Sequence, residues 1–600
     1  MTPFKTNQLK YSLDRNALAE IYDIFQVSTD EKKIKYGSNC LDLPLMEKKV
    51  VSVRFESGNS FFVLMEKSKE NRSLLLNCIK QADDASKLYL PQISFSDVDD
   101  RTILQLLLNS LGNAKNPILR INNLTGHLYC YNADWLTKGK DDSIEQVSCL
   151  EISISKEMRL TFPVHTFTSI KLKDEIYFSK KKPFESYPRF VFSKFHTLAR
   201  KTKESKGEEY IQRPQKFHKS DIEFLNLKDA SKFEASKMGV VADIILRFNE
   251  KFNGLAHLDF ENISKYKTLD HAVAQTKEEE IVKRAFLSNK KLRIIDFVKD
   301  SKSKKLCEGI IPILETLSGI KPVVGVNKIK DGLNIVLIHK KDWYKNEVDP
   351  HSEYKDVSTQ HITVDGVFKS KKANIRSVIN ELIIKDDIKN HKFSLYNWSK
   401  LEYGEKISFA MRVYDADEKE HIVFMTVLPD GTFKFEQKDP TDIFDFNDYT
   451  RCMSVFSSSK DTYGIVMNAA GQMNTIKNTQ WFTIPEIFKI RDELKLDQVH
   501  AVRNKTARDE LMSGILDIKM FEQDGGTYYF VGTIGDGMKV NVANAVNIRK
   551  IEPVDNAPMF FEQLLPLMNT VFVNNQRLTV VPFPFKYLRE WATLNSLSIL

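Results

Sequence analysis

The chain has 600 residues, of which 42% are hydrophobic and 11% aromatic, so it is globular and too long for a single hydrophobic core. A net charge of +8 is compatible with a nucleic-acid partner but does not require one. The six cysteines are scattered without a CxxC pair, which argues against a disulfide framework and a zinc site. The chain has no apolar run of roughly 18 residues and its start lacks the apolar core of a secretory signal, so we expect a soluble cytoplasmic protein with no membrane partner.

The first part of the chain is predicted to be rich in β-strands. Residues 49–66 have the pattern of a hairpin whose turn is Ser57-Gly58-Asn59. Residues 127–136 and 149–167 alternate apolar and polar side chains, which is the period of a strand. These patterns predict a β-rich domain over residues 1–175.

The next part of the chain begins with a basic stretch that contains prolines, between residues 180 and 220. This composition predicts a linker or a surface that faces phosphates, and for any one of its lysines a solvated loop is an equally good interpretation. Residues 228–253 have apolar side chains at helical spacing, so we expect a helix there.

From about residue 290 the pattern becomes strand, helix, strand. Residues 290–298 and 332–339 are apolar strands, and 305–320 is a helix that ends at Gly319. This is the βαβ pattern of a parallel sheet, in which ligands bind at the carboxyl ends of the strands. A basic and aromatic cluster stands at such an end: His339, Lys340, Lys341, Trp343, Tyr344 and Lys345.

Two further polar residues follow this cluster at predicted elements. Gln360 lies on a short strand and Lys385 on the next helix, 25 residues later (385 − 360 = 25). Cationic and amide groups crowded at the end of a buried strand predict an anion pocket. The alternative is that Lys385 and Lys389 are exposed lysines on an amphipathic helix and that Gln360 caps a turn.

Residues 406–437 predict an antiparallel meander with a turn at Pro429-Asp430-Gly431. A strand at 463–471 and a helix at 483–496 follow, and this order suits a ribonuclease-H-type sheet. Asp415, Asp417 and Glu418 lie in a charged turn, where a solvated loop is favoured over a Mg²⁺ site. No GxxxxGK[ST], HExxH, GxSxG or EF-hand pattern occurs, so we expect no nucleotide cofactor.

The series NIVLIHKKDWYKN, STQHITV, NELIIKDDIKN and YNW, between residues 334 and 398, resembles the Argonaute MID domain where it passes into the PIWI domain. The resemblance implies that Gln360 and Lys385 bind the 5′ phosphate of a guide nucleic acid, with Lys389 one turn further along. It assigns the first positions of the pocket to Tyr344 or to a nearby lysine (Lys340, Lys341 or Lys345). It also places the terminal carboxylate of Leu600 near the phosphate, where it can share a Mg²⁺ ion.

The same resemblance bears on catalysis. An active PIWI domain carries metal-binding aspartates on two strands, which correspond here to 407–414 and 464–471. Arg412 and Asn468 stand at those positions, and two-metal cleavage needs several carboxylates. The resemblance therefore implies a degenerate, catalytically inactive site.

The resemblance covers roughly residues 290–600 and implies an α/β multidomain protein with four regions. They are a β-rich N-terminal domain (1–175), a linker region with PAZ absent or reduced (176–288), a Rossmann-like MID domain (289–398) and a ribonuclease-H-like PIWI domain (399–600). The implied protein holds a short guide RNA or DNA, recognises complementary nucleic acid such as invading DNA without cleaving it, and recruits a partner effector (nuclease or helicase) in plasmid or phage defence.

Two alternatives stay open at this point. The first is an active metal-dependent nuclease of ribonuclease-H type that uses other acids, such as Asp415, Asp430 or Asp445. The second is a scaffold subunit of a defence complex that binds a protein partner and no guide.

Overall fold

The computed structural model describes residues 3–30, 41, 49–57, 59–82, 88–112, 119–124, 126–175, 187–192, 198–201, 206–213, 222–269, 284–344, 350, 356–365, 372–394, 398, 404–438, 441–443, 445–496, 502–516, 518–523, 525–530, 539–540, 547–560 and 583–598. The chain is a mixed α/β protein that divides into two compact units. The first unit comprises Met1–Ser264, Gln480–Gly514 and Gly535–Ala543, and the second comprises Lys265–Thr479, Ile515–Ile534 and Asn544–Leu600. No helix in these described ranges is long and apolar enough to cross a bilayer.

The first unit contains a small antiparallel sheet in the order β3-β4-β2-β5, with β6 also paired to β2. Its elements are β2 (Tyr22–Thr29), β3 (Ser52–Ser57), β4 (Ser60–Glu66), helix α3 (Asn71–Ala82), β5 (Leu88–Tyr89) and β6 (Gln92–Ile93). Phe25, Val53 and Phe61 pack with Leu75 and Ile79 of α3 in one core. The hairpin predicted over residues 49–66 is confirmed by the antiparallel pairing of β3 with β4.

A second sheet of this unit has the order β14-β13-β15-β12-β10-β8-β7. Its strands are β7 (Leu119–Leu124), β8 (His127–Asn132), β10 (Ile144–Ile154), β12 (Val164–Ser169), β13 (Phe190–Phe192), β14 (Leu198–Arg200) and β15 (Glu209–Gln212), and short strands β9 (Leu136–Lys138) and β11 (Leu160–Thr161) pair with β10. The strand content predicted for this part of the chain is confirmed.

The first unit also contains helices, two longer strands, and a two-stranded sheet of β16 (Leu225–Asn226) with β30 (Lys539–Val540). The helices and longer strands are β1 (Phe4–Leu13), α1 (Arg15–Ile21), α4 (Asp100–Asn109), α5 (Ala230–Glu234), α6 (Lys237–Lys251), β17 (Ala256–Ile263), α11 (Ile487–Lys495) and α13 (Lys505–Leu511). Strand β1 pairs antiparallel with β17. The helix predicted within residues 228–253 is confirmed, because Met238, Val241, Ile244 and Phe248 of α6 are all buried. The division into four domains stays a prediction.

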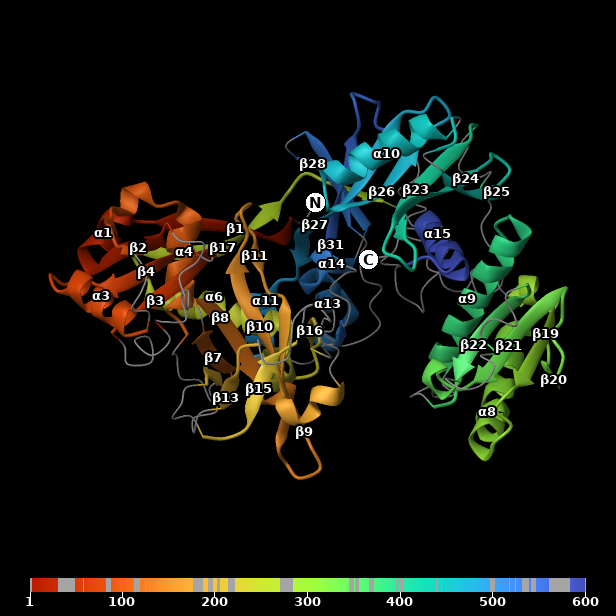
Figure 1. Cartoon of the computed structure of the whole chain (residues 1–600), viewed down its shortest axis with the longest axis horizontal. Coiled ribbons are helices and arrows are strands. Elements are labelled where there is room, and N and C mark those ends of the chain that lie inside the picture. Colours follow the sequence, from red (N-terminus) through yellow and green to blue (C-terminus); the bar gives the residue numbers. More distant parts are fainter. Residues whose placement is uncertain are drawn as a thin grey trace. The chain divides into compact units, whose positions relative to one another are not determined.

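The second unit contains a four-stranded sheet in the order β20-β19-β21-β22, in which every pairing is parallel (Figure 1). Its elements are β19 (Lys291–Asp296), helix α8 (Ser301–Ser318), β20 (Val323–Gly325), β21 (Gly332–Ile338), β22 (Ser358–Thr363) and helix α9 (Lys372–Asn390). The βαβ pattern predicted from residue 290 is therefore confirmed as a parallel sheet. Its core includes Ile294, Ile310, Leu314, Ile335 and Leu382.

Helix α8 begins and ends where its local sequence directs. The side chain of Asp300 accepts a hydrogen bond from the backbone N–H of Ser303 at 2.6 Å, which caps the first turn. Gly319 ends the helix at φ 77°, a left-handed conformation that glycine adopts without a Cβ clash. The predicted helix end at Gly319 is confirmed.

Helix α9 is apolar on two sides. Ile375, Leu382 and neighbouring side chains pack into the core of the parallel sheet. Ile384 and Ile388 instead belong to a second core, which contains residues of the large sheet and of helix α15 (Phe583–Leu594). A helix that is hydrophobic on both sides is buried between two layers. Lys385, Asp386 and Asp387 of α9 are enclosed between these layers, whereas Lys389 and Asn390 at the end of the helix are exposed.

The large sheet of the second unit has the order β18-β28-β29-β31-β27-β26-β23-β24-β25. Its strands are β18 (Lys267–Leu269), β23 (Ile407–Tyr414), β24 (Glu420–Val427), β25 (Phe433–Lys438), β26 (Thr462–Met467), β27 (Met473–Ile484), β28 (Ile518–Gln523), β29 (Gly526–Phe530) and β31 (Asn547–Pro553). The predicted meander is confirmed as β23-β24-β25, and the predicted strand at 463–471 as β26. The helix predicted at 483–496 is shorter, because residues 473–484 form β27 and α11 begins at Ile487.

The direction of β26 differs from the ribonuclease-H-type expectation. Helix α10 (Phe446–Ser458) connects β25 to β26, and a helical crossover normally joins parallel strands. Here β26 pairs antiparallel with β23, and β25 runs parallel to β23 because both pair antiparallel with β24. Strands β25 and β26 are thus antiparallel to each other, and the described pairings do not support a ribonuclease-H-type topology.

Strand β26 approaches helix α15 very closely at Gly464. An ideal Cβ at this position would lie 2.2 Å from Cε1 of Phe585. We predict that Gly464→Ala overpacks this contact and lowers the free energy of unfolding by about 1–3 kcal/mol, measured by guanidinium unfolding. Gly404→Ala is the matched control, because a Cβ at Gly404 meets nothing within 4 Å. Equal unfolding midpoints for both variants would contradict the described packing.

Candidate functional site

The structure brings Gln360 and Lys385 together. Strand β22 lies against helix α9, and the Nζ of Lys385 donates hydrogen bonds to Oε1 of Gln360 at 2.6 Å and to the carbonyl oxygen of Thr359 at 3.0 Å. Both side chains are partly buried. Burial lowers the pKa of Lys385, because desolvation disfavours the charged ammonium, and Glu590 and Glu381 act in the opposite direction.

A second lysine approaches the same place from helix α15. The Nζ of Lys586 contacts Oε1 of Glu590 at 2.7 Å and Oε1 of Glu381 at 3.4 Å. Burial acts to lower the pKa of Lys586, but the two carboxylates outweigh it and raise that pKa. Two lysines and two glutamates therefore form one cluster with a formal charge of zero. We call Gln360, Lys385, Lys586, Glu381 and Glu590 the seam cluster.

The residues next to Lys385 fix α9 on both sides. Asp386 accepts a hydrogen bond from Ser358 Oγ at 2.8 Å and forms an ion pair with Lys290 at 2.9 Å. Asp387 accepts from Tyr587 Oη at 2.6 Å and from Ser394 Oγ at 2.5 Å. Burial raises the pKa of Asp387 to about 7, although both hydroxyl groups act to lower it.

The basic and aromatic cluster lies at the carboxyl end of β21, away from Gln360. Gln360 pairs with Ile335, and His339 is four residues further along β21, which is roughly 13 Å at the rise of a strand. There His339 Nδ1 contacts Asp365 Oδ2 at 2.7 Å, and Lys340 donates its backbone N–H to the same oxygen at 3.1 Å. The structure therefore does not bring Lys340 to Gln360 and Lys385.

The other residues assigned to the pocket are also separate from this pair or lie outside the described residues. Tyr344 is buried, and its Oη accepts the backbone N–H of His339 at 3.0 Å. Lys389 is exposed and donates to the carbonyl oxygen of Lys330 at 2.7 Å. Lys345 and Leu600 lie outside the described residues.

The two positions expected to be degenerate metal sites do not meet. The register pairs Ser408 with Met467, and its continuation places Asn468 beside Ile407. Arg412 is five residues from Ile407 (412 − 407 = 5), or roughly 17 Å along the strand. The structure therefore does not bring Arg412 and Asn468 together, because β23 and β26 are antiparallel, and the degenerate, catalytically inactive site stays a prediction.

Both of these side chains have local structural roles instead. Arg412 pairs with Glu420 on the neighbouring strand at 3.0 Å and lies over the ring of Phe456. Asn468 closes the turn before β27, since its Oδ1 accepts the backbone N–H of Gln472 at 2.9 Å.

The acids proposed for an active nuclease are engaged at separate places. Asp415 contacts His421 at 2.8 Å, Asp430 accepts from Thr432 Oγ1 at 2.7 Å, and Asp445 pairs with Lys438 at 2.6 Å. Among the residues that the structure describes, no group of three or more His, Cys, Asp or Glu is placed to hold a metal ion.

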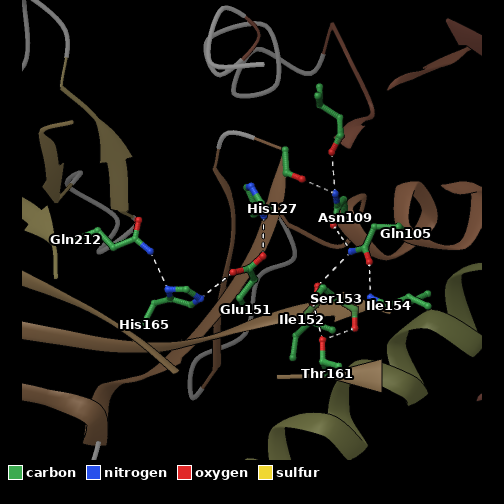
Figure 2. A network of polar contacts seen from close by, with 12 residues as sticks. Gln105, Asn109, His127, Glu151, Ile152, Ser153, Ile154, Thr161, His165 and Gln212 are labelled. Carbon is green, nitrogen blue, oxygen red and sulfur yellow. Dashed lines mark hydrogen bonds and ion pairs between the residues drawn. The ribbon is translucent and has the colours of Figure 1, made fainter. Parts of the chain in front are cut away.

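A polar network in the first unit was not found from the sequence. Figure 2 shows Glu151 of β10 between His127 of β8 and His165 of β12, with Gln212 of β15 on the far side of the His165 ring. Each carboxylate oxygen of Glu151 lies 2.7 Å from one histidine nitrogen, and Gln212 Nε2 lies 2.7 Å from His165 Nδ1. Burial would raise the pKa of Glu151, but the two histidines hold it well below its ordinary range.

A second set of polar contacts joins helix α4 to the same sheet. Gln105 bridges to the backbone of β10 through Ile152 and Ile154, at 3.1 and 2.7 Å (Figure 2). Asn109 donates to the carbonyl oxygens of Val53 and Gly126 at 2.7 and 3.0 Å. The contacts of Glu151 and His165 thus connect β8, β10, β12 and β15, and α4 is bonded to the backbone of β10.

Comparison with protein-family models and with curated proteins found no match to this chain. The site must therefore be interpreted from its own geometry. That geometry is a partly buried ammonium–amide pair on a parallel sheet, with a second ammonium group held nearby by two carboxylates.

Asp387 gives a prediction about pH. Its raised pKa means that the folded state binds the proton more tightly than the unfolded state, so its contribution to stability is greatest below about pH 4 and is lost as the pH rises to about 7. We predict that the free energy of unfolding of the wild type falls relative to that of Asp387→Asn by roughly 1.4 kcal/mol for each pH unit across this window. Parallel pH series of urea unfolding measure it, and a constant difference between the two proteins would refute it.

Glu151 predicts the opposite pH dependence. Its lowered pKa gives stability that is present above the unfolded value of about 4.3 and is lost as the pH falls. Glu151→Gln keeps only one acceptor oxygen, so we expect a loss of about 1–3 kcal/mol at neutral pH that shrinks below pH 4. The exposed Glu20→Gln is the control and should change stability by less than about 0.5 kcal/mol. A loss that grows in acid would contradict this account.

Proposed function

We propose that this chain binds the 5′ phosphate of a short guide RNA or DNA at the seam cluster and uses the guide to recognise complementary nucleic acid. The observation that carries the proposal is the convergence of Lys385 and Gln360, at 2.6 Å, from two elements 25 residues apart. The resemblance of residues 334–398 to an Argonaute MID domain supports the same assignment. Phosphate contacts would supply affinity, and base pairing would supply sequence specificity.

The chemistry of the seam cluster suits a phosphate. A terminal phosphate carries up to two negative charges and several acceptor oxygens, which ammonium and amide N–H groups bind through charge-assisted hydrogen bonds. Burial has lowered the pKa of Lys385, so an arriving anion gains from a cation that water solvates poorly. Lys586 offers a second ammonium group on the adjacent helix.

Glu381 and Glu590 oppose the anion and set the strength of the site. In the described structure they neutralise Lys586, so a phosphate must compete with two carboxylates for it. Neutralising either glutamate would raise the net charge of the cluster from zero to +1. The proposal therefore predicts that removing a lysine lowers the affinity for the phosphate, whereas neutralising a glutamate raises it.

In the proposed role the chain does not cleave its target, and an effector protein (nuclease or helicase) acts on the invading DNA in plasmid or phage defence. The separate engagement of Asp415, Asp430 and Asp445 supports this part of the proposal. The Mg²⁺ ion that the resemblance assigns to the Leu600 carboxylate is not needed for it, and Leu600 lies outside the described residues.

One observation favours a different function. The four charges of the seam cluster already balance, which suits a purely structural joint between α9 and α15. In that case the chain is a scaffold subunit that binds a protein partner and no guide. Purification followed by detection of copurifying 5′-phosphorylated oligonucleotides separates the two functions.

The direct test measures the binding of 5′-phosphorylated and 5′-hydroxyl single strands by fluorescence anisotropy. We predict that the wild type prefers the phosphorylated strand, that Lys385→Ala abolishes at least a tenfold preference, and that Glu590→Gln increases it several-fold. Lys389→Ala is the matched control on the same helix, because its ammonium group bonds to Lys330 instead.

The outcomes of this test are distinct. An equal loss in Lys385→Ala and Lys389→Ala would indicate general attraction to the backbone and contradict the site. Thermal unfolding of each variant shows whether a loss of binding reflects a loss of fold. Guided cleavage of a target by the isolated protein with Mg²⁺ would overturn the non-cleaving assignment.

A further inference from the structure

The parallel sheet of the second unit has an edge that no described element covers. Strand β20 pairs with β19 along one side only and is the last strand in the order β20-β19-β21-β22. Both of its valines and the valine just after it are strongly exposed: Val323 at 55%, Val324 at 53% and Val326 at 71%. Every residue of β21, in the interior of the same sheet, is buried.

Both edges of the large sheet carry charge. The edge strand β25 of the large sheet bears Lys434, Glu436 and Lys438, and the opposite edge β18 begins at Lys267. Charged side chains on an edge strand discourage pairing with another chain. Strand β20 has the sequence Val-Val-Gly and lacks this protection. Its free backbone groups and β-branched side chains favour an added strand.

The charge around the edge indicates what kind of strand. Lys321 precedes β20 and is exposed, and Arg293 lies beside Gly325 on the neighbouring strand. Lys328, which follows β20, forms an ion pair with Asp356 at 2.6 Å. One carboxylate among these three cations leaves the edge with a net positive charge, which an incoming segment with acidic flanks would complement, above all beside Lys321.

We propose that β20 is a docking edge for a partner protein, which adds an extended segment with alternating apolar residues and acidic flanks. Main-chain hydrogen bonds to β20 give the affinity, and Val323, Val324 and Val326 give the apolar contact. This surface is separate from the seam cluster, and the proposal holds whether or not that cluster binds phosphate.

The probe for the test is the synthetic peptide EVTVTVE. Fluorescence anisotropy should show saturable binding to the full chain, and hydrogen exchange at residues 323–326 should slow by about tenfold or more when the peptide is bound. The charge-reversed peptide KVTVTVK and a peptide N-methylated at alternate residues, which cannot donate to the ladder, should bind at least about tenfold more weakly.

The matched protein variants are Val324→Lys and Val324→Thr. Lysine places a charge on the edge and should weaken binding at least about tenfold, whereas threonine keeps the β-branched shape and should retain it. Equal binding by Val324→Lys, or no slowing of exchange at residues 323–326, would overturn the proposal. A concentration-dependent dimer that Val324→Lys dissolves would also overturn it, in favour of a second copy as the occupant.

Discussion

The burial of helix α9 on two sides determines the organisation of the second unit. One side completes the core of the parallel sheet through Leu382 and its neighbours, and the other joins the core that contains Phe585 and Tyr587 of α15. A helix buried in this way has room for polar groups only where the two cores meet, and each such group needs a partner. Lys385, Asp386 and Asp387 are consecutive residues in that position, and each has one.

This constraint explains why the candidate site is balanced in charge. Removing an ammonium group from water is costly unless a carboxylate or another acceptor replaces the water. Lys586 is stabilised by Glu590 and Glu381, and Lys385 by the oxygens of Gln360 and Thr359. The groups to which we assign phosphate binding are thus the same groups that connect α9 to β22 and α15, so the proposed binding would share its interactions with the packing of this region.

The parallel sheet could be predicted because its signal is local, whereas the pairing of Gln360 with Lys385 was expected from the resemblance of residues 334–398 and not from the residues alone. A strand–helix–strand pattern specifies parallel strands, and the end of α8 was readable from Gly319. The partners of the site could not be predicted, since Glu381 and Lys586 are 205 residues apart and no spacing rule links them. The direction of β26 was also not readable, because the apolar pattern of a strand is the same in both directions. Where Asn468 lies relative to Arg412 depends on that direction.

The contacts of Glu151 also could not be predicted from the sequence. His127, Glu151 and His165 lie on three strands with no motif between them, and alternation alone assigns their polar side chains to a solvated face. The structure places Glu151 where both its oxygens accept from histidines, so a polar face is in fact mostly enclosed. Sequence patterns report which residues share a face, but they do not report what covers it.

The chain passes between its two compact units five times, after residues 264, 479, 514, 534 and 543. Strand β27 itself is divided, because Met473–Thr479 belongs to one unit and Gln480–Ile484 to the other. A fragment cut at Ser264, for example, would separate the first unit from its segments Gln480–Gly514 and Gly535–Ala543. The folding of each unit therefore requires segments from distant parts of the gene product, and deletion mapping would assign functions to the wrong half of the molecule.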